Sequence, residues 1–109
     1  MRVCYAVCDS SVQIDHDLRT RIKSELLRAI QKDEITAFLN GFEGDNAEQF
    51  ESIVSETCFS GDVDRVKWHS WTVGHYDLLI AIEHGKTDHI GKIIREAWSS
   101  SKKYSVIWV

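Results

Sequence analysis

The five apolar residues LLIAI at positions 78–82 constrain the fold more than any other part of the sequence. A strand with one face in water alternates apolar and polar residues, whereas a strand that is covered on both faces is apolar throughout. This segment therefore predicts a strand with both faces covered. The segment YSVIWV at 104–109 agrees, because Val106 and Ile107 point to opposite faces of a strand and are both apolar.

Periodicity along the chain predicts strands and helices in the order β-α-β-α-β-β-α-β. Asp15 is placed to cap the first helix, whose inner stripe runs from Leu18 to Ile30 at four-residue spacing. Asn40-Gly41 is expected to end the second strand, and Thr87 to cap the third helix. The predicted strands cover residues 2–8, 34–40, 64–73, 76–83 and 104–109, and the second helix covers 46–59.

The two strands that follow each other directly are predicted to form a hairpin. Gly74-His75 suits a two-residue type II′ turn between 64–73 and 76–83. The fold class that follows is α/β (α+β): a ferredoxin-like sandwich with a mostly antiparallel sheet and helices on one face. The length of 109 residues is near the commonest domain size, so we expect residues 1–109 to form one domain.

If the helices cover only one face of the sheet, this hairpin leaves apolar side chains on the other, uncovered face. Trp68, Leu79 and Ala81 share that face. Because most oligomers are symmetric, a second copy of the same sheet is the simplest cover for it. The sequence therefore predicts a homodimer.

The segment VGHYDLLIAI resembles the G-x-Y-D-hydrophobic strand of ferredoxin-like dimeric α/β-barrel domains, such as the GYD family and the ligand-sensing domain of feast/famine regulators. The resemblance covers about residues 66–109 and assigns Gly74, Tyr76 and Asp77 to the signature. It implies a homodimeric binding module that senses a small ligand at the subunit interface. His75 and Asp77 would then lie near the rim of the dimer.

The segment YAVCD, followed by a basic-flanked helix and ITAFLNGFEG, resembles the small ferredoxin-like CRISPR-associated nucleases and their toxin relatives. In that family an Asp at the end of the first strand binds metal across the dimer, and Asp9 matches it. A metal-dependent nuclease with Asp9 as catalytic residue is therefore a further alternative. An Asp followed by two serines is also an ordinary turn signal.

Histidines and carboxylates follow the strand at 76–83. Glu83, His84, Asp88 and His89 form an alternative group of metal ligands, but their spacing matches no established ligand pattern. The sequence also has no Walker loop and no G-x-S-x-G, G-x-G-x-x-G or H-E-x-x-H motif. We therefore expect no metal ion, no cofactor and no catalysis, and a binding role is favoured.

The charged residues from position 33 to position 64 are all acidic. An acidic surface that includes Glu43, Glu48, Glu51 and Glu56 predicts a second function, that of an inhibitor or immunity-type protein that docks a basic partner protein. The alternative is a solvated helix face. The basic residues of the first helix lack interleaved aromatic residues, so a nucleic-acid partner is not predicted.

Nothing in the sequence predicts a membrane or an export route. No apolar run approaches the ~20 residues of a transmembrane helix. The segment MRVCYAVCDS lacks the small-residue cleavage pattern of a signal peptide. We expect a cytoplasmic protein without a membrane partner, in which Cys4, Cys8 and Cys58 stay reduced.

Overall fold

The computed structural model describes residues 2–57, 64–66, 75–85 and 88–109. The strands and helices in these ranges follow one another in the order predicted from the sequence. None of these helices is long and apolar enough to cross a membrane. The strands are β1 (Val3–Cys8), β2 (Ala37–Phe42), β3 (Asp64–Val66), β4 (Leu78–Glu83) and β5 (Lys103–Trp108), and the helices are α1 (His16–Lys32), α2 (Asn46–Thr57) and α3 (Asp88–Ser99).

The strands form one sheet in the order β3-β2-β1-β4-β5, and every neighbouring pair is parallel. Cys8 at the end of β1 lies beside Phe42 of β2 and Ile82 of β4. The predicted ferredoxin-like, mostly antiparallel sheet is therefore wrong. Helices join β1 to β2, β2 to β3 and β4 to β5, and a helical crossover returns the chain to the end of the sheet where it started, so the joined strands run parallel.

The predicted hairpin is also wrong. β3 lies at the edge beside β2, while β4 lies on the other side of β1, so two strands separate them. Trp68 and Gly74, which the hairpin needs, lie outside the described residues. The apolar run at 78–82 fits the observed position, because strands of parallel sheets are covered on both faces.

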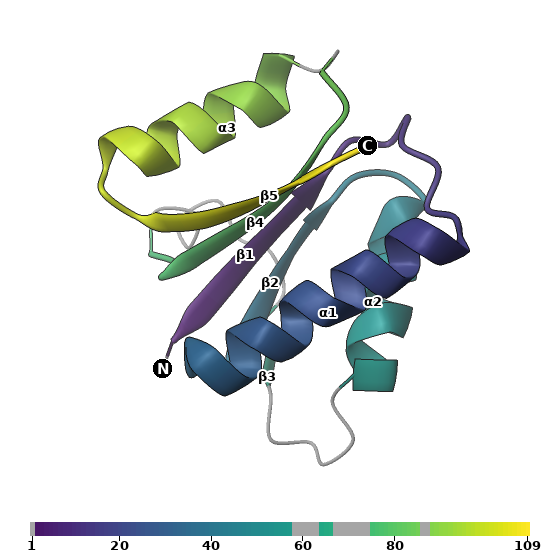
Figure 1. Ribbon diagram of the computed structural model, residues 1–109, viewed down its shortest axis with the longest axis horizontal. Coiled ribbons are helices and arrows are strands. Elements are labelled where there is room, and N and C mark those ends of the chain that lie inside the picture. The colour runs from purple at the N-terminus through teal and green to yellow at the C-terminus, as the bar shows by residue number, and fades with distance from the viewer. Residues whose placement is uncertain (1, 58–63, 67–74, 86–87) are drawn as a thin grey trace.

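Helices cover both faces of the sheet (Figure 1). α1 and α2 pack on one face, where Ile22, Leu26 and Phe50 join the core. α3 packs on the other, where Ile90 and Ala97 join a second cluster. The chain moves outward from β1 to β3 and then in the opposite direction from β4 to β5. Because such crossovers are right-handed, this reversal places the later helix on the opposite face. The expectation of helices on one face is therefore wrong.

The sheet face that was assigned to a second copy is covered by α3 of the same chain. Leu79 and Ala81 are completely buried there, in one cluster with Tyr5, Val7 and Ile90. Neither side chain is available for an interface between copies. The argument for a dimer that packs sheet against sheet therefore disappears.

The start of α1 agrees with the sequence analysis. Asp15 is its N-cap, and the Asp15 Oδ1 accepts a hydrogen bond from the Leu18 N–H at 2.8 Å. Leu18, Ile22 and Leu26 are buried as predicted from their spacing. Local capping and periodicity thus determine this helix.

β2 extends through Gly41 to Phe42, beyond the end predicted at Asn40-Gly41. Gly41 lies so close to β1 that a Cβ atom would be 2.8 Å from the Ala6 carbonyl oxygen and 2.5 Å from the Tyr5 ring. A glycine within a strand often marks such a close approach of two backbones. Because β2 continues to Phe42, Glu43 directly follows the carboxyl end of this strand.

Candidate functional site

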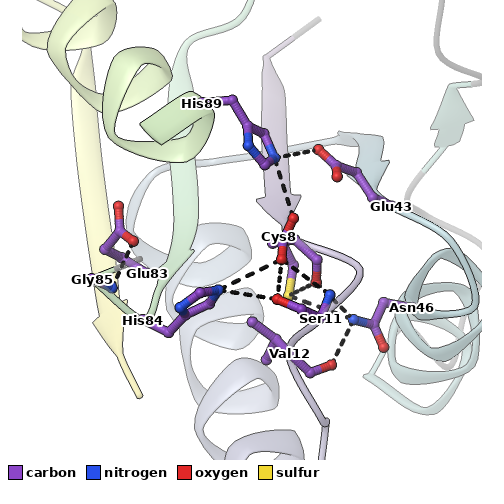
Figure 2. A network of polar contacts seen from close by, with 10 residues as sticks. Cys8, Ser11, Val12, Glu43, Asn46, Glu83, His84, Gly85 and His89 are labelled. Carbon is purple, nitrogen blue, oxygen red and sulfur yellow. Dashed lines mark hydrogen bonds and ion pairs between the residues drawn. The ribbon is translucent and has the colours of Figure 1, made fainter. Parts of the chain in front are cut away.

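Polar side chains gather at the carboxyl end of the sheet. Open parallel sheets bind ligands outside the carboxyl ends of their strands, where the strand order reverses, and that point lies between β1 and β4 here. Asp9, Glu43 and His84 follow β1, β2 and β4, and His89 lies in the first turn of α3. Together with Ser11 they form the carboxyl-end cluster (Figure 2).

Asp9 is the most enclosed member of this cluster, with 8% of its surface exposed. Its Oδ2 accepts hydrogen bonds from the Ser11 hydroxyl and, at 3.0 Å, from the Ser11 N–H. The same oxygen lies 3.5 Å from His84 Nε2, while Oδ1 lies 3.4 Å from His89 Nε2. The hydrogen bond from the Ser11 hydroxyl is the main reason why the pKa of Asp9 lies below its ordinary value, although burial acts in the opposite sense. Asp9 is therefore ionised at neutral pH.

His89 faces two carboxylates. Its Nε2 lies 2.7 Å from Glu43 Oε1 and 3.4 Å from Asp9 Oδ1. Figure 2 shows His89 and Glu43 directed toward each other from α3 and the end of β2. The side chains of His89 and Glu43 are each nearly half exposed, so solvent reaches this side of the cluster.

Asn46, the first residue of α2, holds the loop that carries Asp9 and Ser11. Its side chain is buried, and Nδ2 donates hydrogen bonds to the backbone oxygens of Asp9 at 3.0 Å and Val12 at 2.8 Å. Figure 2 shows the bond from Asn46 to Val12 beneath Ser11. The position of Asp9 thus depends on the packing of α2.

Cys8 lies next to the cluster but keeps its proton. Burial, followed by the negative charges of Asp9 and Glu43, raises the pKa of Cys8 to about 12. Only the thiolate form of cysteine binds metal ions or acts as a nucleophile. Cys8 therefore contributes to packing.

A cavity of about 390 Å³ adjoins the cluster and has the size of a small-molecule site. Ser11 Oγ and His84 Nε2 lie 3.2 Å apart in its wall. Val12, Gln13 and Val109 complete the lining. A separate hollow of about 670 Å³ lies between α3 and β5.

Three members of the cluster lie close enough together that they could hold a metal ion. The donor atoms of Asp9, Glu43 and His89 lie within 4.8 Å of one another. Two carboxylates and one imidazole form a mixed oxygen and nitrogen set, which suits ions such as Zn²⁺ and Mn²⁺. Three protein ligands also leave coordination positions for water or substrate.

The structure does not bring together the metal-ligand group predicted from the sequence. The Glu83 carboxylate accepts a hydrogen bond from the Gly85 N–H at 2.9 Å, and Figure 2 shows it directed away from His84 and His89. Neighbouring residues at the end of a strand point to opposite faces, which separates Glu83 from His84. The Asp88 side chain lies outside the described part of the chain. His84 and His89 instead turn toward Asp9, the residue predicted separately.

The residues assigned to the rim of a dimer lie at the opposite end of the sheet. Tyr76 is buried, with its ring centroid 5.4 Å from that of Tyr5. Asp77 Oδ2 accepts a hydrogen bond from the Val3 N–H at 2.8 Å, and His75 is exposed. Tyr76 and Asp77 thus hold the start of β1 in place. A ligand-binding role for these residues stays a prediction.

The four glutamates of the predicted acidic surface have different environments. Glu56 forms ion pairs with two basic side chains of α1. Glu51 accepts a hydrogen bond from an amide side chain of β2 at 3.1 Å. Glu48 is exposed, and Glu43 belongs to the carboxyl-end cluster. Docking of a basic partner on this surface stays a prediction.

Ser11 and Glu43 are the cluster members that the sequence analysis did not assign to a catalytic or metal site. Their position in the sequence could have indicated a role in a site, because each lies within a few residues of the end of an apolar strand. In a parallel sheet these ends meet at one edge. The predicted hairpin concealed this, because it reverses the strand at 76–83 and so places His84 at the opposite edge of the sheet from Asp9, Ser11 and Glu43.

No protein-family model, no curated protein and no solved structure matches this chain. Its class therefore rests on the fold and the site. It is a doubly wound, parallel α/β domain with a cluster of carboxylates and histidines where the strand order reverses.

Proposed function

We propose that this chain binds a divalent transition-metal ion at Asp9, Glu43 and His89 and uses the ion to hydrolyse a small polar substrate. The observation that carries the proposal is the approach of three donor atoms, from three segments of the chain, to within 4.8 Å of one another. Carboxylate and imidazole ligands bind Zn²⁺ at about 2.0–2.2 Å, so two ligands of one ion lie about 3–4 Å apart. The 3.4 Å between His89 Nε2 and Asp9 Oδ1 has that spacing, whereas the 2.7 Å between His89 Nε2 and Glu43 Oε1 is a hydrogen-bond distance, which must lengthen by a few tenths of an ångström when an ion lies between the two atoms.

The charge of the cluster also favours a cation. An imidazole nitrogen carries at most one proton, yet two carboxylates face His89 Nε2. In the described residues, the hydrogen bonds and ion pairs of the Asp9 and Glu43 carboxylates come from serine and histidine and not from Lys or Arg. The Asp9 carboxylate is buried, and a buried charge is costly unless it is paired, so a dication between the two carboxylates would stabilise the arrangement.

An ion with three protein ligands supplies the chemistry of hydrolysis. It retains open coordination positions and lowers the pKa of a bound water molecule toward neutrality. The adjacent open pocket of about 390 Å³ has the size of a small-molecule site, which favours a small substrate. Ser11 and His84, which line this cavity, offer hydrogen bonds that orient the substrate beside the ion.

Metal binding is tested by calorimetric titration of the purified chain with Zn²⁺ and with Mn²⁺. We expect one ion per chain for the wild type. His89→Ala and Glu43→Gln each remove a ligand. Removal of a hydrogen-bond partner of a metal ligand typically weakens metal binding about 10–100-fold. Removal of the ligand itself should weaken binding by that much or more.

His16→Ala and Glu48→Gln are matched controls, because both residues are exposed and lie outside the cluster. These variants should bind the ion as tightly as the wild type does. Equal affinity of His89→Ala and the wild type would show that the ligands are other residues. If the wild type binds neither ion, the proposal is wrong.

Hydrolysis is tested with small activated substrates, p-nitrophenyl acetate and p-nitrophenyl phosphate, with and without added Zn²⁺ or Mn²⁺. We expect turnover that requires the ion and disappears in Asp9→Asn. His84→Ala should lower the turnover number while the ion affinity stays within a few-fold of the wild type, because His84 is not a proposed ligand. Turnover that continues after treatment with a chelator would contradict a metal-dependent reaction.

A further inference from the structure

The two edges of the sheet differ in their protection against pairing with another strand. Edge strands in natural proteins are short, charged or covered, because their unpaired N–H and C=O groups otherwise recruit further strands. β3 is three residues long and includes Asp64 and Arg65. β5 is six residues long and has a charged residue only at its start, Lys103; the stretch from Tyr104 to Trp108 contains no charged residue and no proline. Within the described residues, the edge formed by β5 is therefore protected only at its first residue.

Two aromatic side chains of β5 extend into solvent. Tyr104 is 41% exposed and Trp108 is 63% exposed. They lie on the α3 face of the sheet with Val106 between them, and all three residues line the hollow of about 670 Å³. α3 does not cover them, because Ile90 and Ala97 pack over β1 and β4.

The backbone groups of these residues point away from the sheet. The Val109 N–H donates a hydrogen bond to the Glu83 carbonyl oxygen of β4, so the backbone groups of Val109 face β4. Alternate residues of a parallel strand face the same neighbour. It follows that Tyr104, Val106 and Trp108 direct their N–H and C=O groups outward, beyond the edge.

We propose that a second copy of this chain pairs with β5 in an antiparallel arrangement, with Val106 opposite the partner's Val106. A two-fold axis perpendicular to the sheet places opposite each other only residues whose side chains lie on the same face. Tyr104, Val106 and Trp108 all lie on the α3 face, so this register is compatible with such an axis. Tyr104 then lies opposite the partner's Trp108. The outward-facing residues exchange about six backbone hydrogen bonds across the interface, two for each directly opposed pair.

A second copy fits this edge because the pattern Tyr104, Val106, Trp108 is self-complementary under the two-fold axis. Aromatic residues directly opposite each other on neighbouring strands stabilise the pairing. The partner's rings also enter the hollow between α3 and β5, which removes the exposed apolar surface of Tyr104 and Trp108 from water. The sheet then continues from one copy into the other, and neither β5 remains an edge.

The register is tested with Val106→Cys in a Cys58→Ser background, because Cys4 and Cys8 are buried. Directly opposed residues of a hydrogen-bonded pair have Cα atoms about 5.5 Å apart. A short bifunctional thiol-alkylating reagent should therefore join most of the chains through residue 106, as seen on a denaturing gel. Lys92→Cys in the same background is the control, since it presents an exposed thiol on α3, and it should stay uncoupled.

Sedimentation at micromolar concentration should give twice the chain mass of 12.5 kDa for the wild type. Val106→Lys places two like charges opposite each other and should give a monomer, whereas Leu27→Lys, which replaces an exposed apolar residue of α1, should leave the dimer intact. A monomeric wild type would overturn the proposal. So would a dimer in which the thiol introduced by Val106→Cys is not cross-linked, since its interface would lie elsewhere. If Val106→Lys does not fold, the cross-linking result alone decides.

Discussion

Asn46 shows how a single buried side chain positions a site that it does not enter. Its amide bridges the backbone oxygens of Asp9 and Val12, which ties the loop after β1 to the start of α2. The Asp9 oxygen also accepts a hydrogen bond from the Val12 N–H at 3.2 Å, whereas a buried carbonyl group that is left without a partner costs about 1–3 kcal/mol. The geometry around Asp9 therefore depends on a residue that no pattern in the sequence singled out.

Asn46→Ala should lower the free energy of unfolding by about 1–3 kcal/mol, because two hydrogen bonds to buried backbone oxygens are lost. It should also weaken metal binding, since the loop that carries Asp9 loses its support. Urea denaturation and calorimetric titration measure the two effects. Gln49→Ala, at an exposed position of the same helix, should change the free energy of unfolding and the metal affinity much less than Asn46→Ala does.

Glu56 should give part of the stability a dependence on pH. Hydrogen bonds from Lys23 and Arg19 lower the pKa of Glu56 below its ordinary value of 4.5. A carboxyl group with a lower pKa in the folded state stabilises the fold above the unfolded-state pKa, and this contribution is lost as the pH falls through the folded-state pKa. Glu56→Gln should therefore be less stable than the wild type at neutral pH and equally stable in strong acid.

The effect of Glu56→Gln should be small and should decrease with added salt, because this ion pair is exposed. Urea midpoints at neutral and strongly acidic pH, each at low and high salt, measure it. Glu48→Gln, which removes an exposed carboxylate from the same helix, serves as the comparison. The same loss of stability at both pH values would rule out the ion pairs as its cause.

At the scale of the elements, the contact between β1 and β2 depends on the missing side chain of Gly41. An alanine Cβ would lie 2.8 Å from the Ala6 carbonyl oxygen, and backbone atoms within a sheet cannot move aside cheaply. Gly41→Ala should therefore lower the free energy of unfolding by about 1–3 kcal/mol, as other overpacked positions do. Thermal and urea denaturation measure the loss, and an unchanged midpoint would show that β2 can shift.

Local patterns in the sequence predicted the order of the helices and strands and the start of α1, but not every boundary. The cap at Asp15 and the stripe from Leu18 to Leu26 are where the sequence placed them, because capping and periodicity involve residues close in sequence. The end of β2 was misplaced, because glycine is a turn signal locally and a close-contact signal within a sheet. Only the neighbouring strand distinguishes the two cases.

For the whole molecule, the cover provided by α3 decides whether the second sheet face belongs to the core or to an interface. Leu79 lies completely buried in that face. Leu79→Ala should lower the free energy of unfolding by about 2–5 kcal/mol, as truncation of a core leucine does. Leu27→Ala, at an exposed position of α1, should stay within about 0.5 kcal/mol of the wild type.

The Leu79→Ala loss should be the same at low and high protein concentration when measured by urea denaturation. A core position contributes to the folding of each chain by itself, whereas the stability of an interface position depends on the concentration of protomers. Concentration dependence of the difference between Leu79→Ala and the wild type would therefore favour the sheet-to-sheet dimer over the observed cover by α3.

The sequence by itself determined the kinds of elements, their order, and the fact that the strand at 78–82 is covered on both faces, because these depend on residues that are neighbours along the chain. It also indicated Asp9, His84 and His89 as residues of interest, but in two unrelated groups. The pairing of the strands, the opposite placement of α3, and the meeting of Asp9, Glu43 and His89 were decided only by the tertiary structure. There are two physical reasons. Parallel pairing depends on the direction in which each crossover returns to the sheet. A site at the carboxyl ends of the strands brings together residues that are far apart along the chain, so their spacing in the sequence does not predict their contact.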